Sequence, residues 1–310
     1  MGATLLHYRP WQGEFRSAHA SIWPIARVGL RMLFRFWPFW GIYSLGLMVF
    51  GLFFFGQYLL TWAETQVGEA EVRVGGFGRT DPHSLIQVLR HVLKLNGSGE
   101  TYRNFIWFQS YFILVILALA GSMLVGNDIR HGSMAFYLSK PISRWHYVLG
   151  KCLAVAVLIN MMTTLPAVVL FIEYGLLDSW YYFQDNWRLL LGVLGYGLIL
   201  TLTFSLLLVA LATAVKRTVP MIMAWATLFL FPRFVAMTFV GVLRFDPRWR
   251  LFDLWNDAYL VANWCLGITH EQVRPQPQPS FLNAALVLVA LWIVCLAFQV
   301  RRVQAIEIVR

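Results

Sequence analysis

Six long apolar segments alternate with polar stretches along the chain, and each is close to or above the roughly 20 residues that an α-helix needs to cross a lipid bilayer. We therefore expect membrane-spanning helices at residues 36–62, 105–126, 147–172, 189–215, 219–243 and 281–300. Pro166 should kink the third helix and the Pro232-Arg233 pair should break the fifth, because proline lacks the backbone N–H of a helix interior. The pattern predicts an all-α integral membrane protein with six transmembrane helices, organised as one domain over residues 1–310.

A basic stripe precedes the first apolar segment. Arg27, Arg31 and Arg35 recur at every fourth position between Pro24 and Trp37, so they share one helical face, while apolar and aromatic residues fill most of the remainder. This composition is typical of a helix that lies in the membrane interface, and it would complete a cytoplasmic N-terminal region at residues 1–35. The alternative is that the stretch is only the flank of the first membrane helix.

The composition agrees with a membrane protein. Hydrophobic residues make up 59% of the chain, charged residues make up 13% and the mean hydropathy is +0.62, whereas soluble domains carry about 25% charged residues. The three cysteines are sparse, since Cys152 and Cys295 fall inside apolar runs and only Cys265 is expected to face outside. They predict neither a disulfide framework nor a cysteine metal site, and the net charge of +10 is explained by loop placement better than by nucleic-acid binding.

An even number of spans places both ends of the chain on the same side of the membrane. The short loop between the third and fourth spans holds Arg188 against Glu173, Asp178 and Asp185. Because Lys and Arg in short loops favour the cytoplasmic side, this loop is expected outside and both termini inside.

The two long loops are then external. In loop 63–103, Asp81-Pro82 should start a small helix with an apolar stripe that ends at Asn96-Gly97. Loop 244–280 is aromatic and amphipathic, so part of it is expected to lie in the interface or to re-enter the membrane. The internal loops are too short to fold a soluble catalytic domain.

A polar interruption, Asn127–Lys151, separates the second and third spans. Ser133 can cap a short helix that runs to about Leu138, Pro141 then stops it, and Ser143 can cap the next membrane helix. The sequence thus predicts a short amphipathic helix, held against one face of the membrane between two spans, that another protein could push.

This interruption resembles the corresponding stretch of permease subunits of ABC type-2 exporters. That family often shows an acidic residue, a Gly-Thr or Gly-Ser step, a run of small and Leu-like residues, Ser-x-Pro-[Ile/Val]-Ser-Arg, and Gly-Lys about six residues later. The matching positions are Asp128, where the family often has Glu, Gly132-Ser133, Leu138, Ser139-Lys140-Pro141-Ile142-Ser143-Arg144 and Gly150-Lys151. The six-span plan and the amphipathic N-terminal helix extend the resemblance over most of the chain.

The resemblance implies a cytoplasmic coupling helix near His131–Leu138, seated in a groove of a separate ATPase subunit. Aromatic and apolar side chains dominate such contacts, so Met134, Phe136, Tyr137 and Leu138 are the expected anchors. The full set of expected ATPase-coupling residues is Asp128, Gly132, Ser133, Met134, Phe136, Tyr137, Leu138, Pro141 and Arg144, with a smaller contact at Lys216 and Arg217. Lys140 and Arg144 could instead meet anionic lipid headgroups.

The resemblance also implies the partners and the location. A second permease copy, most simply a homodimer, would bind two copies of a cytoplasmic ABC ATPase in the cell inner membrane. The sequence has no G-x-x-x-x-G-K-[ST] phosphate-binding loop, so ATP and Mg are expected in the partner and no cofactor is expected on this chain.

Several polar residues fall within the predicted spans. Arg233 is the only charge well inside one, and an intramembrane charge suggests a substrate pathway; the alternative is that the helix breaks at Pro232 and Arg233 snorkels to the outer surface. Gln57, Asn160 and Thr163 are further candidates for the substrate pathway, or else form hydrogen bonds between helices. Gly192, Gly195 and Gly197 should permit close helix packing, and Met161-Met162, Met221 and Met223 are expected to fill apolar space rather than to bind a soft metal.

These features favour a non-catalytic permease subunit that couples ATP hydrolysis by a partner to export of a substrate. A second hypothesis keeps the fold and partner but passes the ATPase motion to an extracytoplasmic protein without substrate flux. A third, an integral membrane enzyme, would need paired acid, base or nucleophile groups at membrane depth, and the spans offer no such pair at helical spacing.

Overall fold

The computed structural model describes residues 18–66, 94–121, 143–215 and 217–302, with short pieces at 72–74, 78–80, 87–88, 90 and 123–124. Within these residues, six helical segments are long and apolar enough to cross a membrane. They are α2 (Trp37–Gln66), α4 (Gly99–Gly121), α7 (Arg144–Met162) with α8 (Thr164–Asp178), α10 (Trp187–Ala214), α11 (Thr218–Ala236) with the π-helix η3 (Met237–Val242), and α13 (Phe281–Arg302). The prediction of an all-α protein with six transmembrane helices is confirmed.

Shorter elements connect these helices. They are the 3₁₀ helix η1 (Ala18–Ser21), α1 (Ile22–Phe34), α9 (Trp180–Asp185), the 3₁₀ helix η4 (Pro247–Phe252), α12 (Leu254–Cys265) and the 3₁₀ helix η5 (His270–Gln272). A small antiparallel hairpin in the loop between α2 and α4 pairs β1 (Val72–Val74) with β2 (Gly78–Thr80), in the register Val72 to Thr80, Arg73 to Arg79 and Val74 to Gly78.

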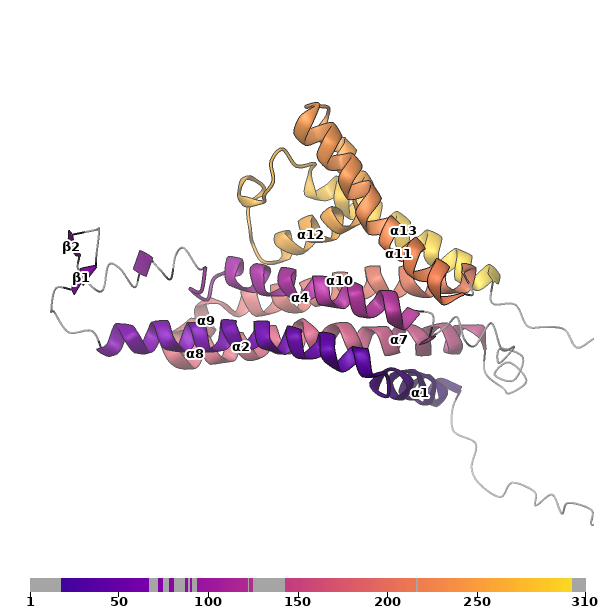
Figure 1. The fold of residues 1–310 in the computed structure, drawn as a ribbon, viewed down its shortest axis with the longest axis horizontal. Helices are drawn as coiled ribbons and strands as arrows, with labels where there is room; N and C mark the ends of the chain where they lie inside the picture. Colours follow the sequence, from indigo (N-terminus) through magenta and orange to yellow (C-terminus); the bar gives the residue numbers. More distant parts are fainter. Residues whose placement is uncertain are drawn as a thin grey trace, which may run out of the picture.

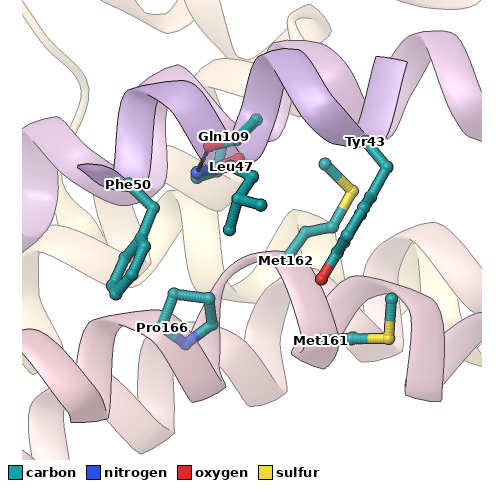
Figure 2. A pocket seen from close by; sticks show the side chains of 8 residues that line it. Tyr43, Leu47, Phe50, Gln109, Met161, Met162 and Pro166 are labelled. Atoms are coloured by element: carbon teal, nitrogen blue, oxygen red, sulfur yellow. Dashed lines mark hydrogen bonds between the residues drawn. The ribbon is translucent and has the colours of Figure 1, made fainter. Parts of the chain in front are cut away.

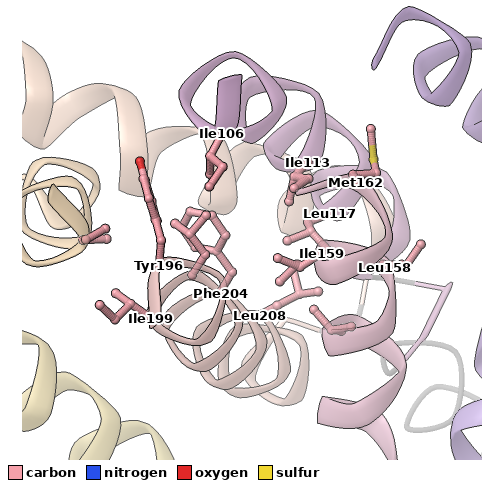
Figure 3. Close-up of a cluster of buried hydrophobic side chains, with 14 of the residues drawn as sticks. Ile106, Ile113, Leu117, Leu158, Ile159, Met162, Tyr196, Ile199, Phe204 and Leu208 are labelled. Atoms are coloured by element: carbon pink, nitrogen blue, oxygen red, sulfur yellow. The ribbon is translucent and has the colours of Figure 1, made fainter. Parts of the chain in front are cut away.

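The long helices α2, α4, α7, α8 and α10 run side by side along the long axis of the molecule, and α11 leaves this bundle at an angle (Figure 1). The most buried of the six spans is α10. Figure 3 shows Tyr196, Phe204 and Leu208 of α10 among side chains of α4 and α7, including Leu117 and Ile159. Since lipid tails are as apolar as these side chains, close packing rather than the hydrophobic effect holds the helices together.

Polar side chains fasten neighbouring helices to one another through backbone carbonyls. Gln109 of α4 donates to the carbonyl oxygen of Gly46 in α2 (2.7 Å). The indole N–H of Trp225 in α11 reaches Leu114 O in α4 (3.1 Å). Gln299 of α13 reaches Leu206 O in α10 (2.7 Å). Such bonds between helices fix the rotation of α2, α11 and α13 on the bundle.

The N-terminal basic stripe forms a helix of its own, because α1 ends at Phe34 before α2 begins. Its buried face, which includes Ile25, Ala26, Leu30 and Leu33, packs mainly on α7. The amphipathic helix is therefore present as a separate element, and its placement in the membrane interface stays a prediction.

The two proline sites behave differently. The third span breaks at Thr163, three residues before Pro166, since Pro166 offers no N–H to the carbonyl of Met162. The expected break at Pro232-Arg233 is wrong, because α11 continues through Pro232 to Ala236 and into η3. Pro232 removes only one backbone donor, and the turns on either side retain their hydrogen bonds.

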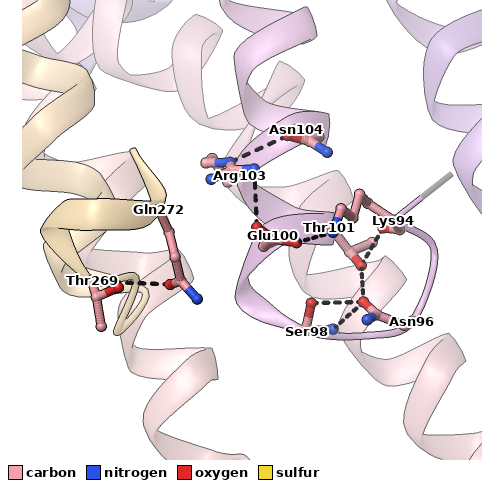
Figure 4. Close-up of polar contacts among 9 residues, drawn as sticks. All are labelled: Lys94, Asn96, Ser98, Glu100, Thr101, Arg103, Asn104, Thr269 and Gln272. Atoms are coloured by element: carbon pink, nitrogen blue, oxygen red, sulfur yellow. Dashed lines mark hydrogen bonds and ion pairs between the residues drawn. The ribbon is translucent and has the colours of Figure 1, made fainter. Parts of the chain in front are cut away.

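The small helix expected in the loop between α2 and α4 ends earlier than predicted. The expected start at Asp81-Pro82 lies outside the described residues. The expected end at Asn96-Gly97 is wrong, because Lys94 already has a positive φ of 56° and the N–H of Leu95 bonds to Arg90 O (3.1 Å), as in a helix-ending turn. Asn96 instead accepts hydrogen bonds from Ser98 and Thr101 at the start of α4 (Figure 4).

The loop between η3 and α13 folds back onto the bundle. Its helix α12 packs on α10 and α13, and the close contact uses small residues. A Cβ atom at Gly192 would lie 2.4 Å from Cys265 O, and one at Gly195 would lie 3.3 Å from Cys265 Sγ. The prediction that these glycines permit close packing is confirmed, whereas Cys265 faces α10 rather than only the outside. The depth of this loop in a bilayer stays a prediction.

Candidate functional site

A cavity of about 350 Å³ lies beside α12, near the start of α4 and the end of α11. Four arginines from different parts of the chain line it, and one acidic residue, Asp253, lines it with them. The arginines are Arg103 of α4, Arg233 of α11, Arg250 of η4 and Arg274 of the loop before α13. The rest of the wall holds three aromatic residues, three other apolar residues and two asparagines, so the cavity joins positive charge to apolar surface. Its volume lies within the range of small-molecule sites.

Arg233 reaches this cavity from a continuous helix. Its guanidinium carbon lies 5.6 Å from the ring centroid of Trp107 on α4, within the range of a cation–π contact. The helix break at Pro232 on which the alternative interpretation rested is therefore wrong, whereas the position of Arg233 relative to the outer surface of the membrane stays a prediction. Arg103 is held from its own side by Glu100 (3.5 Å) and Asn104 Oδ1 (3.2 Å), as Figure 4 shows.

Asp253 organises the beginning of α12. Its Oδ1 accepts hydrogen bonds from the backbone N–H groups of Trp255 (3.1 Å) and Asn256 (3.2 Å), which is the geometry of an N-cap. Burial raises the pKa of the Asp253 carboxyl, and these two bonds together with Arg233 and Arg250 oppose that rise. Asp253, the one acidic residue among the described residues that line the cavity, thus caps α12 and also faces the arginines.

Two further buried groups lack hydrogen-bond partners among the described residues. Arg250 is only 6% exposed and its Nε is unpaired; burial lowers the pKa of its guanidinium, and Asp253 opposes this. Asp257, one turn after Asp253, is fully buried with both carboxyl oxygens unpaired. Burial, followed by the charge of Asp253, raises the pKa of Asp257 to about 9, so this carboxyl holds its proton at neutral pH.

Of the charged residues that line this cavity, only Arg233 was a candidate from the sequence, and Arg103, Arg250, Asp253 and Arg274 were missed, as was Asp257 nearby. The signal that could have found Arg250, Asp253 and Asp257 is the dense alternation of charged and aromatic residues from Asp246 to Asp257, with an Asp-to-Asn spacing typical of a helix start.

The other three candidates for the substrate pathway lie elsewhere. Asn160 donates to Thr201 Oγ1 (2.9 Å) and accepts from Thr164 Oγ1 (2.7 Å), joining α7, α8 and α10. Thr163 Oγ1 donates to the carbonyl oxygen of Ile159, one turn back in α7 (2.8 Å). Gln57 is buried in α2, and its amide has no hydrogen-bond partner among the described residues. For Asn160 this arrangement supports the alternative of hydrogen bonding between helices.

We expect Asn160→Ala to lower the free energy of unfolding by about 1 kcal/mol, the scale of interhelical hydrogen bonds in membranes. A double-mutant cycle with Thr201→Ala, measured by chemical unfolding in detergent, isolates the pair. A coupling energy of zero between Asn160 and Thr201 would show that the bond contributes nothing to stability.

The methionine pair lies between α2 and the α7–α8 break. Figure 2 shows Met161 and Met162 with Tyr43, Phe50 and Pro166 around a cavity of about 20 Å³, which has room for about one water molecule. In the other pair Met221 is fully buried whereas Met223 is 64% exposed, so these two do not face a common site. Both arrangements agree with apolar packing.

Most of the expected ATPase-coupling residues lie outside the described residues: Asp128, Gly132, Ser133, Met134, Phe136, Tyr137, Leu138, Pro141 and Lys216. Arg144 is the first residue of α7, and nothing is described of its side chain. Arg217 is exposed and occupies the N-cap position of α11.

The residues on either side of this stretch, Leu124 and those from Ser143 onward, are described, and a hydrogen bond joins them. The ammonium group of Lys151 in α7 donates to the carbonyl oxygen of Leu124, which follows α4. A Cβ atom at Gly29 of α1 would lie 2.9 Å from Leu124 Cδ2, and one at Gly150 would lie 2.8 Å from Ile25 of α1. Gly150 and Lys151, which close the motif recognised in the sequence, thus join α1, α7 and the end of α4.

The first turn of α7 has a further contact with the N-terminal elements. Ser143 Oγ hydrogen-bonds His146 Nδ1 (2.5 Å), and the His146 ring lies 4.9 Å, centroid to centroid, from that of His19 in η1. The residues on both sides of the stretch 125–142 therefore lie in a packed base of three helices, α1, α4 and α7.

Comparisons with known proteins agree with this architecture. The model of a family described as ABC-2 family transporter protein matches residues 23–246, from α1 to the residues after η3. A search of curated proteins found no match. Because the family match covers well over half of the chain and its six apolar helices fit a multi-pass protein, the chain belongs to the ABC-2 family of transporter proteins and is a membrane permease of an ABC transporter.

Proposed function

We propose that the chain is the permease subunit of an ATP-driven exporter in the cell inner membrane, with both termini in the cytoplasm. A dimer of two copies would bind two copies of a separate ABC ATPase. The stretch around His131–Leu138 would be the coupling helix, and Lys216-Arg217 would add a smaller contact. The chain would bind neither ATP nor Mg itself and would catalyse no reaction.

The observation that carries the proposal is the packed base of the coupling stretch. Residues 125–142 are bounded by Leu124 and Ser143, and the Lys151 bond ties the Leu124 end to α7. Because α7 and α4 both pack on α10, a push on the stretch would move packed helices as a body rather than bend a loop. Such coupling requires packed elements that move together.

The test is a mild-detergent pull-down of the tagged full-length chain from its native membrane, with mass spectrometry of the recovered proteins. We expect an ATPase with a phosphate-binding loop to co-purify, and we expect Phe136→Asp plus Leu138→Asp to reduce its recovery at least tenfold. A carboxylate in an apolar protein contact is strongly unfavourable.

The matched control is Trp180→Asp plus Tyr181→Asp in α9, two exposed aromatic positions at the other end of the bundle. It introduces the same two charges and should leave ATPase recovery unchanged. If the native chain recovers no ATPase under conditions that preserve other ABC transporters, the proposal fails.

Flux assays in proteoliposomes separate export from the alternative of force transmission. The cavity beside α12 favours export, because a substrate needs a binding site within the permease and a force transmitter does not. ATPase activity that responds to an extracytoplasmic partner, without any substrate movement, would favour the alternative.

A further inference from the structure

The charges that line the cavity beside α12 do not balance. Four arginines face one aspartate that is already engaged as a helix cap. Within the described part of the chain, Arg233, Arg250 and Arg274 have no acidic side chain within 4.0 Å, and Asp257 nearby is protonated at neutral pH. Arg103 pairs with Glu100, and Asp253 offsets one of the other three arginine charges, so the cavity keeps an excess of two positive charges in a space of about 350 Å³.

A cavity with excess positive charge favours an anion, because the anion offsets the repulsion and satisfies unpaired donors. Arg250 is nine-tenths buried, lines the cavity and has an unpaired Nε. A carboxylate brings one negative charge and two oxygens. A phosphate monoester brings up to two charges and three terminal oxygens, so it matches three separate guanidinium groups better, and arginine forks suit its geometry.

We propose that this cavity is a binding site for a phosphate monoester group. The arginines hold the phosphate, and the aromatic side chains Trp107, Trp255 and Tyr259 of the wall accept the apolar part attached to it. The group can belong to a lipid headgroup or to a soluble phosphate. The family match ends at residue 246, so Arg250, Arg274 and α12 are features of this chain beyond the matched region. The inference extends the proposed export function by naming a ligand class.

The test is isothermal titration calorimetry on the purified full-length chain in detergent, without an ATPase, with dihexanoyl phosphatidic acid and inorganic phosphate as separate probes. Dihexanoyl phosphatidylcholine, whose headgroup has no net charge, and acetate are the comparison ligands. Because the assay needs no partner, its failure would leave the proposed coupling function standing, and failure of the pull-down would leave this site testable.

The structure offers a matched pair of arginines. Arg188 of α10 lies 5.6 Å from the Trp187 ring, the same distance as Arg233 from the Trp107 ring, but it is exposed and away from the cavity. We expect Arg233→Gln to weaken binding about tenfold or more, the scale of one charge-assisted hydrogen bond, while Arg188→Gln leaves it unchanged. Arg274→Gln, at an exposed position where a substitution usually changes stability little, should also weaken binding.

The outcomes of these titrations distinguish a lipid phosphate from a soluble phosphate as the ligand. Saturable binding of phosphatidic acid with this arginine dependence supports a lipid phosphate. Binding of inorganic phosphate alone, with the same dependence, supports a soluble phosphate. The proposal is overturned if neither probe saturates, if acetate or phosphatidylcholine binds as tightly, or if Arg188→Gln weakens binding as much as Arg233→Gln.

Discussion

Replacing Gly197 by alanine is expected to lower the free energy of unfolding by about 1–3 kcal/mol, the usual cost of overpacking a tight core. The new Cβ atom would lie 1.9 Å from Thr164 Oγ1 and 3.0 Å from Thr164 Cβ. Thr164 begins α8 directly after the Thr163 break, and its hydroxyl is engaged with Asn160. The clash therefore also breaks the polar link between α7, α8 and α10. Thermal or chemical unfolding in detergent measures the effect.

Two comparisons isolate the contact. Gly241→Ala in η3 adds the same methyl group where nothing lies within 4 Å, so it should be nearly neutral. In the background of Thr164→Ala, Gly197→Ala should cost less, since the oxygen at 1.9 Å is gone and the Cβ contact at 3.0 Å remains. Equal losses for Gly197→Ala and Gly241→Ala would show that the backbone, rather than the close approach, sets the cost.

The spans could be predicted because their signal is local. A run of some 20 apolar residues must form its backbone hydrogen bonds within itself when it lies in lipid, and each of the six apolar runs forms such a helix. The separate helix α1 has an equally local signal in its arginine spacing. The break near Pro166 also follows from one residue, although it occurs at Thr163.

The region around the cavity beside α12 could not be predicted because its contacts are between distant segments. Arg103 and Arg274 are far apart in the sequence, and only the fold brings them to one cavity. Asp257 looks like an ordinary loop carboxylate until α12 packs on α10 and α13. The wrong prediction at Pro232 has a similar origin. The rule that proline breaks a helix considers an isolated helix and leaves out the neighbouring turns and helices that allow α11 to continue.

The motif at the coupling stretch could be predicted in part, since the sequence located it but did not explain its residue types. The residues Gly150-Lys151 were recognised by resemblance, without a reason for their type. The structure supplies one, because any side chain larger than glycine at position 150 would meet Ile25, and only a long donor at 151 reaches the Leu124 carbonyl. The sequence pattern thus located a packed junction whose contacts only the fold explains.

The stability of the native protein is expected to fall as the pH rises from 5 to 9, with Asp257 as a main contributor. An aspartate in the unfolded chain has a pKa of about 3.9, whereas burial and Asp253 raise the pKa of Asp257 to about 9 in the folded protein. Between these values the folded state holds a proton that the unfolded state releases. The stabilisation is therefore complete below about pH 4 and is lost as the pH rises through 9, at about 1.4 kcal/mol per pH unit.

Asp257→Asn should remove this slope, because the amide has nearly the same shape and does not ionise. The variant should approach the stability of the native chain at pH 4 and below and exceed it near pH 9, as measured by unfolding in detergent from pH 4 to pH 9. Asp246→Asn makes the same chemical change at an exposed carboxyl that caps η4, and it should keep the native slope. A native curve that is flat between pH 5 and 9, or an unchanged slope in Asp257→Asn, would show that this carboxyl is already ionised in the folded protein, and the charge balance drawn for the arginine cavity would then have to include it.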